Sequence, residues 1–467
     1  MRNLPIIALF ILLTNIGIAQ ERSYTFSLEQ AIEFALENNR SVINADRDIE
    51  AAKKQKWETT AIGLPQINGA VEYQNFLKQP VSLLPASAFD NRESTIQTVE
   101  DFFGLTRTGS PEPADGLIPV VFGAKQSINA SATLSQLIFD GSYLVGLQSA
   151  KVFLEISENA KEKTDQEVRK AVIAAYGNVL LAEESVKISE RNRVTLQKNL
   201  DETTKIFENG LGEEESVEQL TITLANVESV LNNAIRFREI AYNLLKITIG
   251  ASISDKLQLN DNLESLVKEN IVLGLLNTDE GIENNIDLKI AKNTERTREL
   301  QLKYEKSQAL PSLSAFLNGG YQSFADKDFT FFNEGNRWFG SALIGINLNI
   351  PIFSSLQRSA KTQRARIAFE QAKTDFTETE QRLQLELEQL KSEYQFTVEQ
   401  YETAKENLAL AERIEKKNQT KFFEGIGSSF ELRQAQTQLY TIQQEYLQAM
   451  VNVINKKTEL ETLLNTY

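Results

Sequence analysis

The stretch FENGLG at 207–212 is repeated later in the chain as FFEGIG at 422–427. Each copy ends a run of about 70 residues without proline, one beginning near Phe139 and the other near Phe353. At 1.5 Å per residue, each run has the length of a helix of about 100 Å. A glycine-containing turn then returns the chain into a further helical segment. The two stretches therefore predict two long antiparallel helical hairpins.

These hairpins belong to a larger internal duplication. ALENN at 35–39 recurs as GIENN at 281–285, an offset of 246 residues, whereas SQLIFDGS at 135–142 corresponds to NIPIFSSL at 349–356, an offset of 214 residues. The offset falls between these pairs because the first copy has a longer loop. Each copy has the order helix, strand, loop, strand, very long helix, tight turn, helix.

We expect a first repeat at 24–250, a second repeat at 271–464 and a polar linker between them at 251–270. The elements expected in the first repeat after its first helix are strands at about 66–76 and 127–138, a long helix at about 140–209 and a helix at about 213–249. Those expected in the second repeat are strands at about 312–324 and 339–350, a long helix at about 354–424 and a helix at about 428–464.

All four expected strands alternate with a period of two residues. In QINGAVEYQ (66–74), for example, Ile67, Val71 and Tyr73 share one face and polar residues occupy the other. Strands of about 10 residues with one apolar face and one small polar face suit a membrane barrel. A soluble sheet with one wet face produces the same alternation. If the strands lie in a membrane, several chains must build one barrel, because four strands leave open edges.

The second proline-free run has heptad spacing, which is typical of coiled coils. Phe369, Phe376, Leu383 and Leu390 are seven residues apart. A coiled-coil rod or the hairpin of a periplasmic adaptor has the same spacing. The heptads alone therefore do not separate a channel from an interaction protein.

Composition excludes several classes of function. The 467 residues include 49 Lys and Arg, 64 Asp and Glu, no Cys and no His, with a net charge of −15. The negative charge argues against nucleic-acid binding, and the missing Cys and His exclude disulfides, thiolate or imidazole catalysis and the usual zinc sites. No GxxxxGK[ST] phosphate loop is present. A secreted hydrolase with a carboxylate pair remains as an alternative, although carboxylates along helices are usually solvated. We expect no enzyme, cofactor or metal site.

The first 19 residues are typical of a secretory signal peptide. Arg2 precedes an apolar stretch from Leu4 to Leu13, and Gly17 and Ala19 offer small residues before Gln20. No run of about 18 apolar residues follows in the expected mature chain. We therefore expect an exported protein without a helical membrane anchor.

The duplicated order of elements resembles the TolC-like outer-membrane factors across essentially the whole mature chain. The helix–turn–helix stretches NGLGEEESVEQL (209–220) and EGIGSSFELRQAQTQL (424–439) are similar to that family's hairpin tips. SQLIF (135–139) and IPIF (350–353) are similar to its strand-to-helix junctions.

This resemblance implies a mixed α and β fold, in which long helical hairpins form a coiled-coil α-barrel. It also implies a homotrimer with a 12-stranded outer-membrane β-barrel, to which each chain contributes four strands. The implied function is passive export across the outer membrane of a Gram-negative bacterium, in a tripartite efflux or type I secretion system. The implied partners are a periplasmic adaptor, an inner-membrane transporter and outer-membrane lipid. Small molecules, metal ions and secreted proteins all remain open as cargo.

The resemblance also implies site residues at the hairpin tips. Counted from Gly425, the positions of the family's periplasmic aspartate ring are Glu431 and Gln434, of which only Glu431 keeps the charge. Glu431 is equally suited to a helix start, where a carboxylate favours the helix dipole. The expected adaptor-docking residues at the two tips are Gly210, Leu211, Gly212, Gly425, Ile426 and Gly427.

Overall fold

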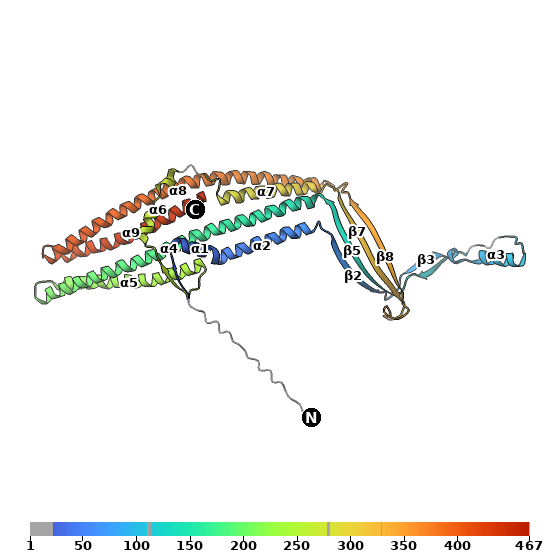
Figure 1. Cartoon of the computed structure of the whole chain (residues 1–467), viewed down its shortest axis with the longest axis horizontal. Coiled ribbons are helices and arrows are strands. Elements are labelled where there is room, and N and C mark those ends of the chain that lie inside the picture. Colours follow the sequence, from blue (N-terminus) through green and yellow to red (C-terminus); the bar gives the residue numbers. More distant parts are fainter. Residues whose placement is uncertain (1–21, 110–111, 113, 278–280, 328, 467) are drawn as a thin grey trace, which may run out of the picture. The chain divides into compact units, whose positions relative to one another are not determined.

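The computed structural model describes residues 22–109, 112, 114–277, 281–327 and 329–466 (Figure 1). The expected signal peptide at 1–19 lies outside the described residues. The described chain divides into two compact units. The helical unit comprises the described parts of 22–56, 148–302 and 361–466, and the sheet unit comprises those of 57–147 and 303–360.

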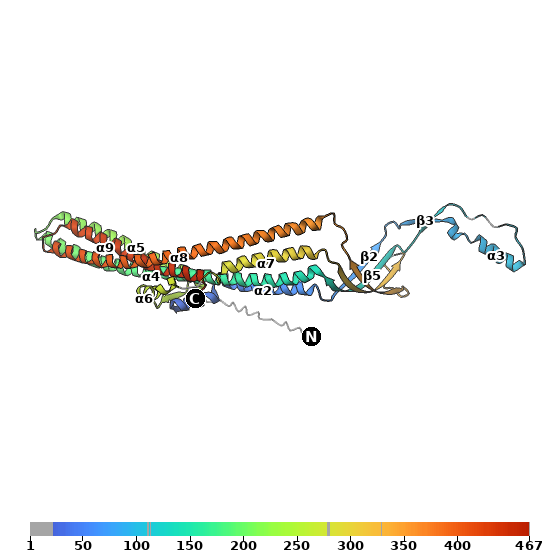
Figure 2. The same cartoon turned by 90° about the horizontal axis from the view of Figure 1, so that it is seen from above.

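Two long helical hairpins dominate the helical unit (Figures 1 and 2). Helix α4 (Gly141–Glu208) is followed by α5 (Glu214–Ile249), and α8 (Gln357–Phe423) is followed by α9 (Ser429–Leu464). The first helix of each hairpin has 68 or 67 residues and the second has 36. In α8 the heptad residue Leu383 is buried and Phe369, Phe376 and Leu390 are half-buried. The fold class predicted from the sequence is confirmed in its long antiparallel hairpins.

The half-length helices meet end to end at two asparagine joints. The first joint involves α1 (Leu28–Asn38), α2 (Arg40–Ala61) and α5. The Nδ2 of Asn39 donates to the carbonyl oxygen of Thr248, 2.6 Å away, near the end of α5. Its Oδ1 accepts from the backbone N–H of Ser41, 2.7 Å away, at the start of α2. One side chain therefore satisfies an unpaired carbonyl of one helix and an unpaired N–H of the next.

The second joint repeats this geometry at the start of α7 (Ile286–Ser307). Asn285 donates to the carbonyl oxygen of Leu463 in α9, 2.8 Å away, and accepts from the backbone N–H of Asp287, 2.8 Å away. Asn39 and Asn285 are the last residues of the repeated ALENN and GIENN motifs. The two repeats therefore share the same asparagine joint between helices, and this joint accounts for part of the internal duplication in the sequence.

A glycine is required where the first joint closes. Gly250 ends α5 with a φ of +85°, in the left-handed region. A Cβ placed on Gly250 would lie 2.2 Å from the carbonyl oxygen of Asn38, so a larger residue would displace α1.

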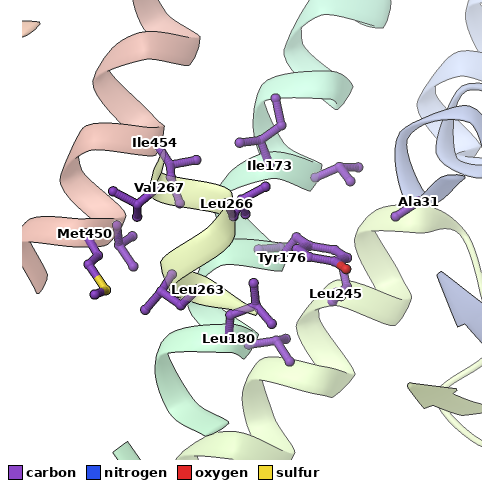
Figure 3. Close-up of a cluster of buried hydrophobic side chains, with 14 of the residues drawn as sticks. Ala31, Ile173, Tyr176, Leu180, Leu245, Leu263, Leu266, Val267, Met450 and Ile454 are labelled. Carbon is purple, nitrogen blue, oxygen red and sulfur yellow. The ribbon is translucent and has the colours of Figure 1, made fainter. Parts of the chain in front are cut away.

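The main hydrophobic core lies where the shorter elements cross the long helices (Figure 3). Strand β1 (Ser23–Phe26) pairs in parallel with β6 (Lys256–Leu259), and α6 (Leu263–Asn270) follows β6. Leu263 and Val267 of α6 are buried against Tyr176 of α4 and Ile454 of α9. The Tyr176 hydroxyl donates to Asp261 Oδ2, 2.9 Å away. The segment interpreted as a polar linker is thus folded and contributes to the core. A short 3-10 helix, η2 (Leu273–Asn277), follows it.

The sheet unit contains one four-stranded antiparallel sheet in the order β2-β5-β7-β8. Its strands are β2 (Gln66–Asn75), β5 (Gln126–Asp140), β7 (Ser312–Ala325) and β8 (Trp338–Asn349). The two central strands come from different repeats and pair along almost their whole lengths. The two outer strands, β2 and β8, each have one unpaired edge within the described chain.

The long connection between β2 and β5 is more ordered than predicted. It contains β3 (Val81–Pro85), the 3-10 helix η1 (Ala86–Phe89), α3 (Arg92–Phe103) and β4 (Leu117–Val121). Proline is rare within strands, yet Pro85 and Pro119 both lie in the β3–β4 pair. Ala86 donates to the carbonyl oxygen of Gly116, so Ala86 and Gly116 form a hydrogen-bonded pair, and hydrogen-bonded and non-hydrogen-bonded pairs alternate along the strands from there. Pro85 and Pro119 both lie in non-hydrogen-bonded pairs. At such a position the N–H of any other residue would point away from the partner strand.

Candidate functional site

The register of the four-stranded sheet places one apolar set on the same face of every strand. Ile67 lies opposite Leu134, which in turn lies opposite Leu317, which lies opposite Ile344. Ile67 and Ile344 are 75% and 77% exposed, whereas Ile128 at one end of this face is buried against Phe331, so the face is bare only in part within the described chain. The apolar face consists of Ile67, Gly69, Val71, Tyr73, Ile128, Ala130, Ala132, Leu134, Leu313, Ala315, Leu317, Gly319, Tyr321, Ala342, Ile344, Ile346 and Leu348.

The opposite face carries mainly hydroxyl and amide groups. Asn68, Thr133 and Asn318 are neighbours across three strands, and Asn318 Nδ2 donates to Thr133 Oγ1, 2.7 Å away. The apolar exceptions on this face are Ala70, Leu137, Phe316, Phe324, Phe339 and Leu343. Its polar residues are Gln66, Asn68, Glu72, Gln74, Ser127, Asn129, Ser131, Thr133, Ser135, Ser312, Ser314, Asn318, Gln322, Ser341, Asn347 and Asn349. A sheet that is apolar on one face and wettable on the other suits a wall between lipid and water.

An aromatic cluster at one end of the sheet was not predicted from the sequence. Phe331, in the turn between β7 and β8, is completely buried. Its ring lies 5.9 Å from that of Tyr73 and 5.1 Å from that of Phe329, measured between centroids. Trp338 Nε1 donates to the carbonyl oxygen of Phe331, 3.2 Å away. The available signal was the density of aromatic residues at 329–339, a composition typical of membrane interfaces.

The free edge of β2 is ready to pair with another strand. Phe76 donates to the carbonyl oxygen of Lys125, which fixes the alternation of hydrogen-bonded pairs between β2 and β5. It follows that Ile67, Val71 and Tyr73 direct their backbone N–H and C=O groups away from β5. Such groups cannot stay unpaired in a membrane, so a further strand has to cover them.

Both hairpin tips are built by the same helix ending, a Schellman motif. At the first tip, Gly210 donates to the carbonyl oxygen of Phe207 and Leu211 donates to that of Ile206. At the second tip, Gly425 donates to Phe422 and Ile426 donates to Lys421. Gly210 and Gly425 both have a φ of +75°, which glycine adopts without strain.

The remaining tip residues are shaped by close packing and by exposure. A Cβ on Gly212 would lie 3.1 Å from Ile206 Cγ2, and a Cβ on Gly427 would lie 3.0 Å from Lys421 Cβ. Leu211 and Ile426 are 82% and 73% exposed. Each tip therefore presents one bare aliphatic side chain on a tightly fixed turn.

Glu431 and Gln434 are both exposed at the start of α9. Ser428 and Glu431 form a capping box, in which Ser428 Oγ accepts from the Glu431 N–H and a carboxylate oxygen of Glu431 accepts from the Ser428 N–H, each at 3.2 Å. Glu431 therefore has a structural role at this helix start. Gln434 follows three residues later, on the same side of the helix.

A buried polar layer lies deeper in the helical unit. Gln419 of α8 donates to Asn199 Oδ1 of α4, 2.9 Å away. Gln436 of α9 is fully buried and its amide lies next to the Glu415 carboxyl of α8. Burial raises the pKa of the Glu415 carboxyl above its usual 4.5. Burial likewise raises the pKa of Tyr440.

The raised pKa of Glu415 leads us to expect a folding stability that depends on pH. Because its pKa is higher in the folded chain than in the unfolded chain, the folded state retains the proton to higher pH. The contribution of Glu415 to the free energy of unfolding therefore falls as pH rises above about 4.5 and is not reduced below it. Glu415→Gln is expected to raise the melting temperature at pH 8 by about 1–3 °C and to leave it unchanged at pH 4. Thermal unfolding followed by circular dichroism tests this, and equal shifts at both pH values would contradict it.

The described residues lack two kinds of feature. No helix there is long and apolar enough to cross a membrane. No group of three or more Asp and Glu side chains there is arranged to hold a metal ion.

Comparisons with known proteins agree with this geometry. Residues 278–466 match the family model described as outer membrane efflux protein. Outer membrane protein TolC of Vibrio cholerae serotype O1 is 22% identical over 251 residues, which cover 53% of this chain and 56% of TolC. The aligned region thus spans little more than half of that curated relative.

The similarity to solved structures extends over the whole fold. The structure of CusC superposes with a TM-score of 0.70 at 17% identity, covering 94% of this chain and 92% of CusC. VceC from Vibrio cholerae superposes with a TM-score of 0.67 at 16% identity, covering 94% and 95%. The MtrE outer membrane channel of Neisseria gonorrhoeae superposes with a TM-score of 0.67 at 15% identity, covering 94% and 88%.

Long helical hairpins, a two-faced sheet and these superpositions define the fold of an outer-membrane channel protomer. Residues 278–466 thus match the outer membrane efflux protein family, and the chain is similar to TolC, as its tips and its duplication predict. That family consists of channel proteins and not of enzymes.

Proposed function

We propose that the chain is one protomer of a trimeric outer-membrane channel, which conducts solutes passively from the periplasm to the exterior of a Gram-negative bacterium. The observation that carries this proposal is the register of the sheet, which separates an exposed apolar face from a hydroxyl- and amide-rich face. In a closed barrel the first face contacts lipid and the second lines a water-filled lumen.

Closure requires further copies of the chain. The unpaired edges of β2 and β8 are complementary parts of one ladder if β2 of one protomer pairs with β8 of the next. Three copies of four strands make a 12-stranded barrel, the number suggested by the family. The long helices then form the periplasmic tube.

Partners supply the energy and the connection to the inner membrane. The chain has no phosphate loop with which to hydrolyse a nucleotide. An inner-membrane transporter therefore drives export in a tripartite efflux or type I secretion system, and the channel itself performs no catalysis. A periplasmic adaptor docks on the tips, where Leu211 and Ile426 offer exposed aliphatic contacts. Gly210, Gly212, Gly425 and Gly427 keep the tip turns in the required shape.

The rival interpretation, a periplasmic adaptor, has less support. It predicts one helical hairpin and soluble strand domains. The described chain has two hairpins, and part of the apolar face of its sheet is bare.

Membrane fractionation and electrical recording test the proposal together. The full-length protein is expected to fractionate with outer membranes and to form conducting pores in planar bilayers at three times the protomer mass. A soluble periplasmic protein that does not conduct would exclude the channel and favour the adaptor.

The connection between β2 and β5 is expected to face the cell exterior and the tips to face the periplasm. Trypsin added to intact cells should then cut at the exposed Lys78 in the long connection. A glutamate-specific protease should cut at Glu213–Glu215 in the first tip only after the outer membrane is permeabilised. Fragment masses identify the sites, and cleavage at the tip in intact cells would invert this topology.

A further inference from the structure

The junction between β8 and α8 lies in a stretch without acidic residues. Residues 335–369 contain no Asp or Glu, although the chain has 64 of them among 467 residues. Within this stretch four basic residues gather in the first ten positions of α8, namely Arg358, Lys361, Arg364 and Arg366. At the offset of 214 residues, the first repeat contains Asp140 and Glu155 in the corresponding stretch. The basic cluster is therefore specific to the second repeat.

An exposed apolar turn directly precedes these charges in the chain. Ile352, Phe353 and Leu356 are 89%, 81% and 75% exposed. The turn has a defined shape, since Ser355 and Leu356 adopt left-handed conformations with φ of 47° and 65°. Arg358 holds it by donating to the carbonyl oxygen of Pro351, 2.9 Å away, and to Ser354 Oγ, 3.1 Å away. The backbone therefore presents these apolar side chains to the surroundings.

The other three basic side chains have no partner of opposite charge. Lys361, Arg364 and Arg366 are exposed, and none forms an ion pair within the part of the chain that the structure describes. Helical side chains tilt towards the N-terminus of their helix, so these three point towards the first turn of α8. The start of a helix gives cations no stabilisation from the dipole. Their concentration at this end therefore indicates an external anion.

We propose that residues 350–366, the basic junction, bind the headgroups of anionic phospholipids in the membrane leaflet nearest to the helices. This inference rests on the proposed function, because it needs the apolar face of the sheet to be in lipid. Ile352, Phe353 and Leu356 then enter the boundary between acyl chains and headgroups, while Lys361, Arg364 and Arg366 contact the phosphodiesters.

The dimensions fit this arrangement. A polar headgroup layer is about 5–8 Å thick on each side of the hydrocarbon. Lys361 lies about 6 Å and Arg366 about 14 Å along the helix from its first residue. Long basic side chains that extend towards the membrane cover this difference. Basic residues next to a membrane also attract anionic lipids collectively.

A lipid-selectivity measurement tests the proposal with the full-length protein in phosphatidylcholine vesicles. The probe is pyrene-labelled phosphatidylglycerol, with pyrene-labelled phosphatidylcholine as the reference. The test variant is Lys361→Gln/Arg364→Gln/Arg366→Gln. The matched control is Arg413→Gln/Lys416→Gln/Lys417→Gln, which removes three exposed charges from the other end of α8.

Wild type and control are expected to prefer the anionic probe, and the test variant is expected to lose about tenfold in relative association. Equal preference in test variant and control would overturn the proposal. So would displacement of the probe by millimolar glycerol phosphate, which would indicate a site for free phosphate.

Two further measurements keep the outcome interpretable. The single variant Lys361→Gln, a milder change, should show a smaller loss in the same direction, and no loss would count against the basic junction. Conductance of the wild-type vesicles separates the two proposals. Conducting protein without lipid preference contradicts only the basic junction, whereas protein that does not insert or conduct contradicts the channel.

Discussion

Replacing both Ile67 and Val71 by proline is expected to leave the protein as single chains. In β2 these residues direct their N–H groups away from β5, as the hydrogen bond between Phe76 and Lys125 requires. Proline removes the N–H and places its ring where the neighbouring strand must approach. The ladder inside the protomer keeps its hydrogen bonds, because neither N–H takes part in it. The expected protein mass therefore falls from three times 52.6 kDa to 52.6 kDa, in both cases less any signal peptide.

Light scattering of detergent-solubilised protein measures this mass. Ile67→Ala/Val71→Ala is the matched control, since it removes the same apolar side chains and keeps both N–H groups. The control should remain trimeric. A trimeric proline variant, or a wild-type chain that is a stable monomer with full secondary structure, would contradict closure through this edge.

The second large effect is expected at Glu431, if three copies of it surround the axis of the channel. Carboxylates gathered in a narrow, poorly hydrated mouth repel one another and bind multivalent cations. Glu431→Gln should weaken the block of single-channel current by hexamminecobalt by at least about tenfold, equivalent to about 1.4 kcal/mol. Gln434→Glu should strengthen the block, because it adds a second ring of charge on the same side of the helix.

The capping box makes the choice of substitution important. Glutamine at position 431 can still accept the hydrogen bond from the Ser428 N–H, so Glu431→Gln removes the charge and keeps the helix start. Glu431→Ala removes both and is expected to destabilise the tip by about 0.3–1 kcal/mol. If wild type and Glu431→Gln are blocked equally, Glu431 does not line the constriction. If only Glu431→Ala differs from wild type in its block by the cation, the role of Glu431 is confined to capping the helix.

The sequence was sufficient to predict those parts of the fold that repeat a simple period. Ile67, Val71 and Tyr73 alternate, and the register carries that alternation across all four strands. Leu383 marks a heptad stripe, and it is buried. Gly210 and Gly425 predicted the ends of two long helices, and each occupies the left-handed position of a Schellman motif.

The sequence was insufficient where structure depends on partners distant in the chain. Strand β6 has four residues and pairs with β1, more than two hundred residues away. Helix α6 has eight residues, too few to display a helical period in the sequence, and it is held in place by the hydrophobic core. Pro119 is a case in which the sequence argued against a strand that the structure contains. Its ring is compatible with the strand only because it occupies a non-hydrogen-bonded position of the ladder, and the register that places it there is not visible in one segment alone.

The asparagine joints have a consequence for how such proteins can change in length. Each joint ties the far end of a hairpin arm to another helix, so the two arms of a hairpin can only grow together. Seven residues added to α4 alone would make α4 about 10 Å longer than its partner arm and force the tip turn apart. Seven residues added to both arms would move the tip outward by about 10 Å and leave the joints, the sheet and the packing phase untouched. A homologue with a longer tube is therefore expected to carry paired heptad insertions, equidistant from the tip glycines, in both of its repeats.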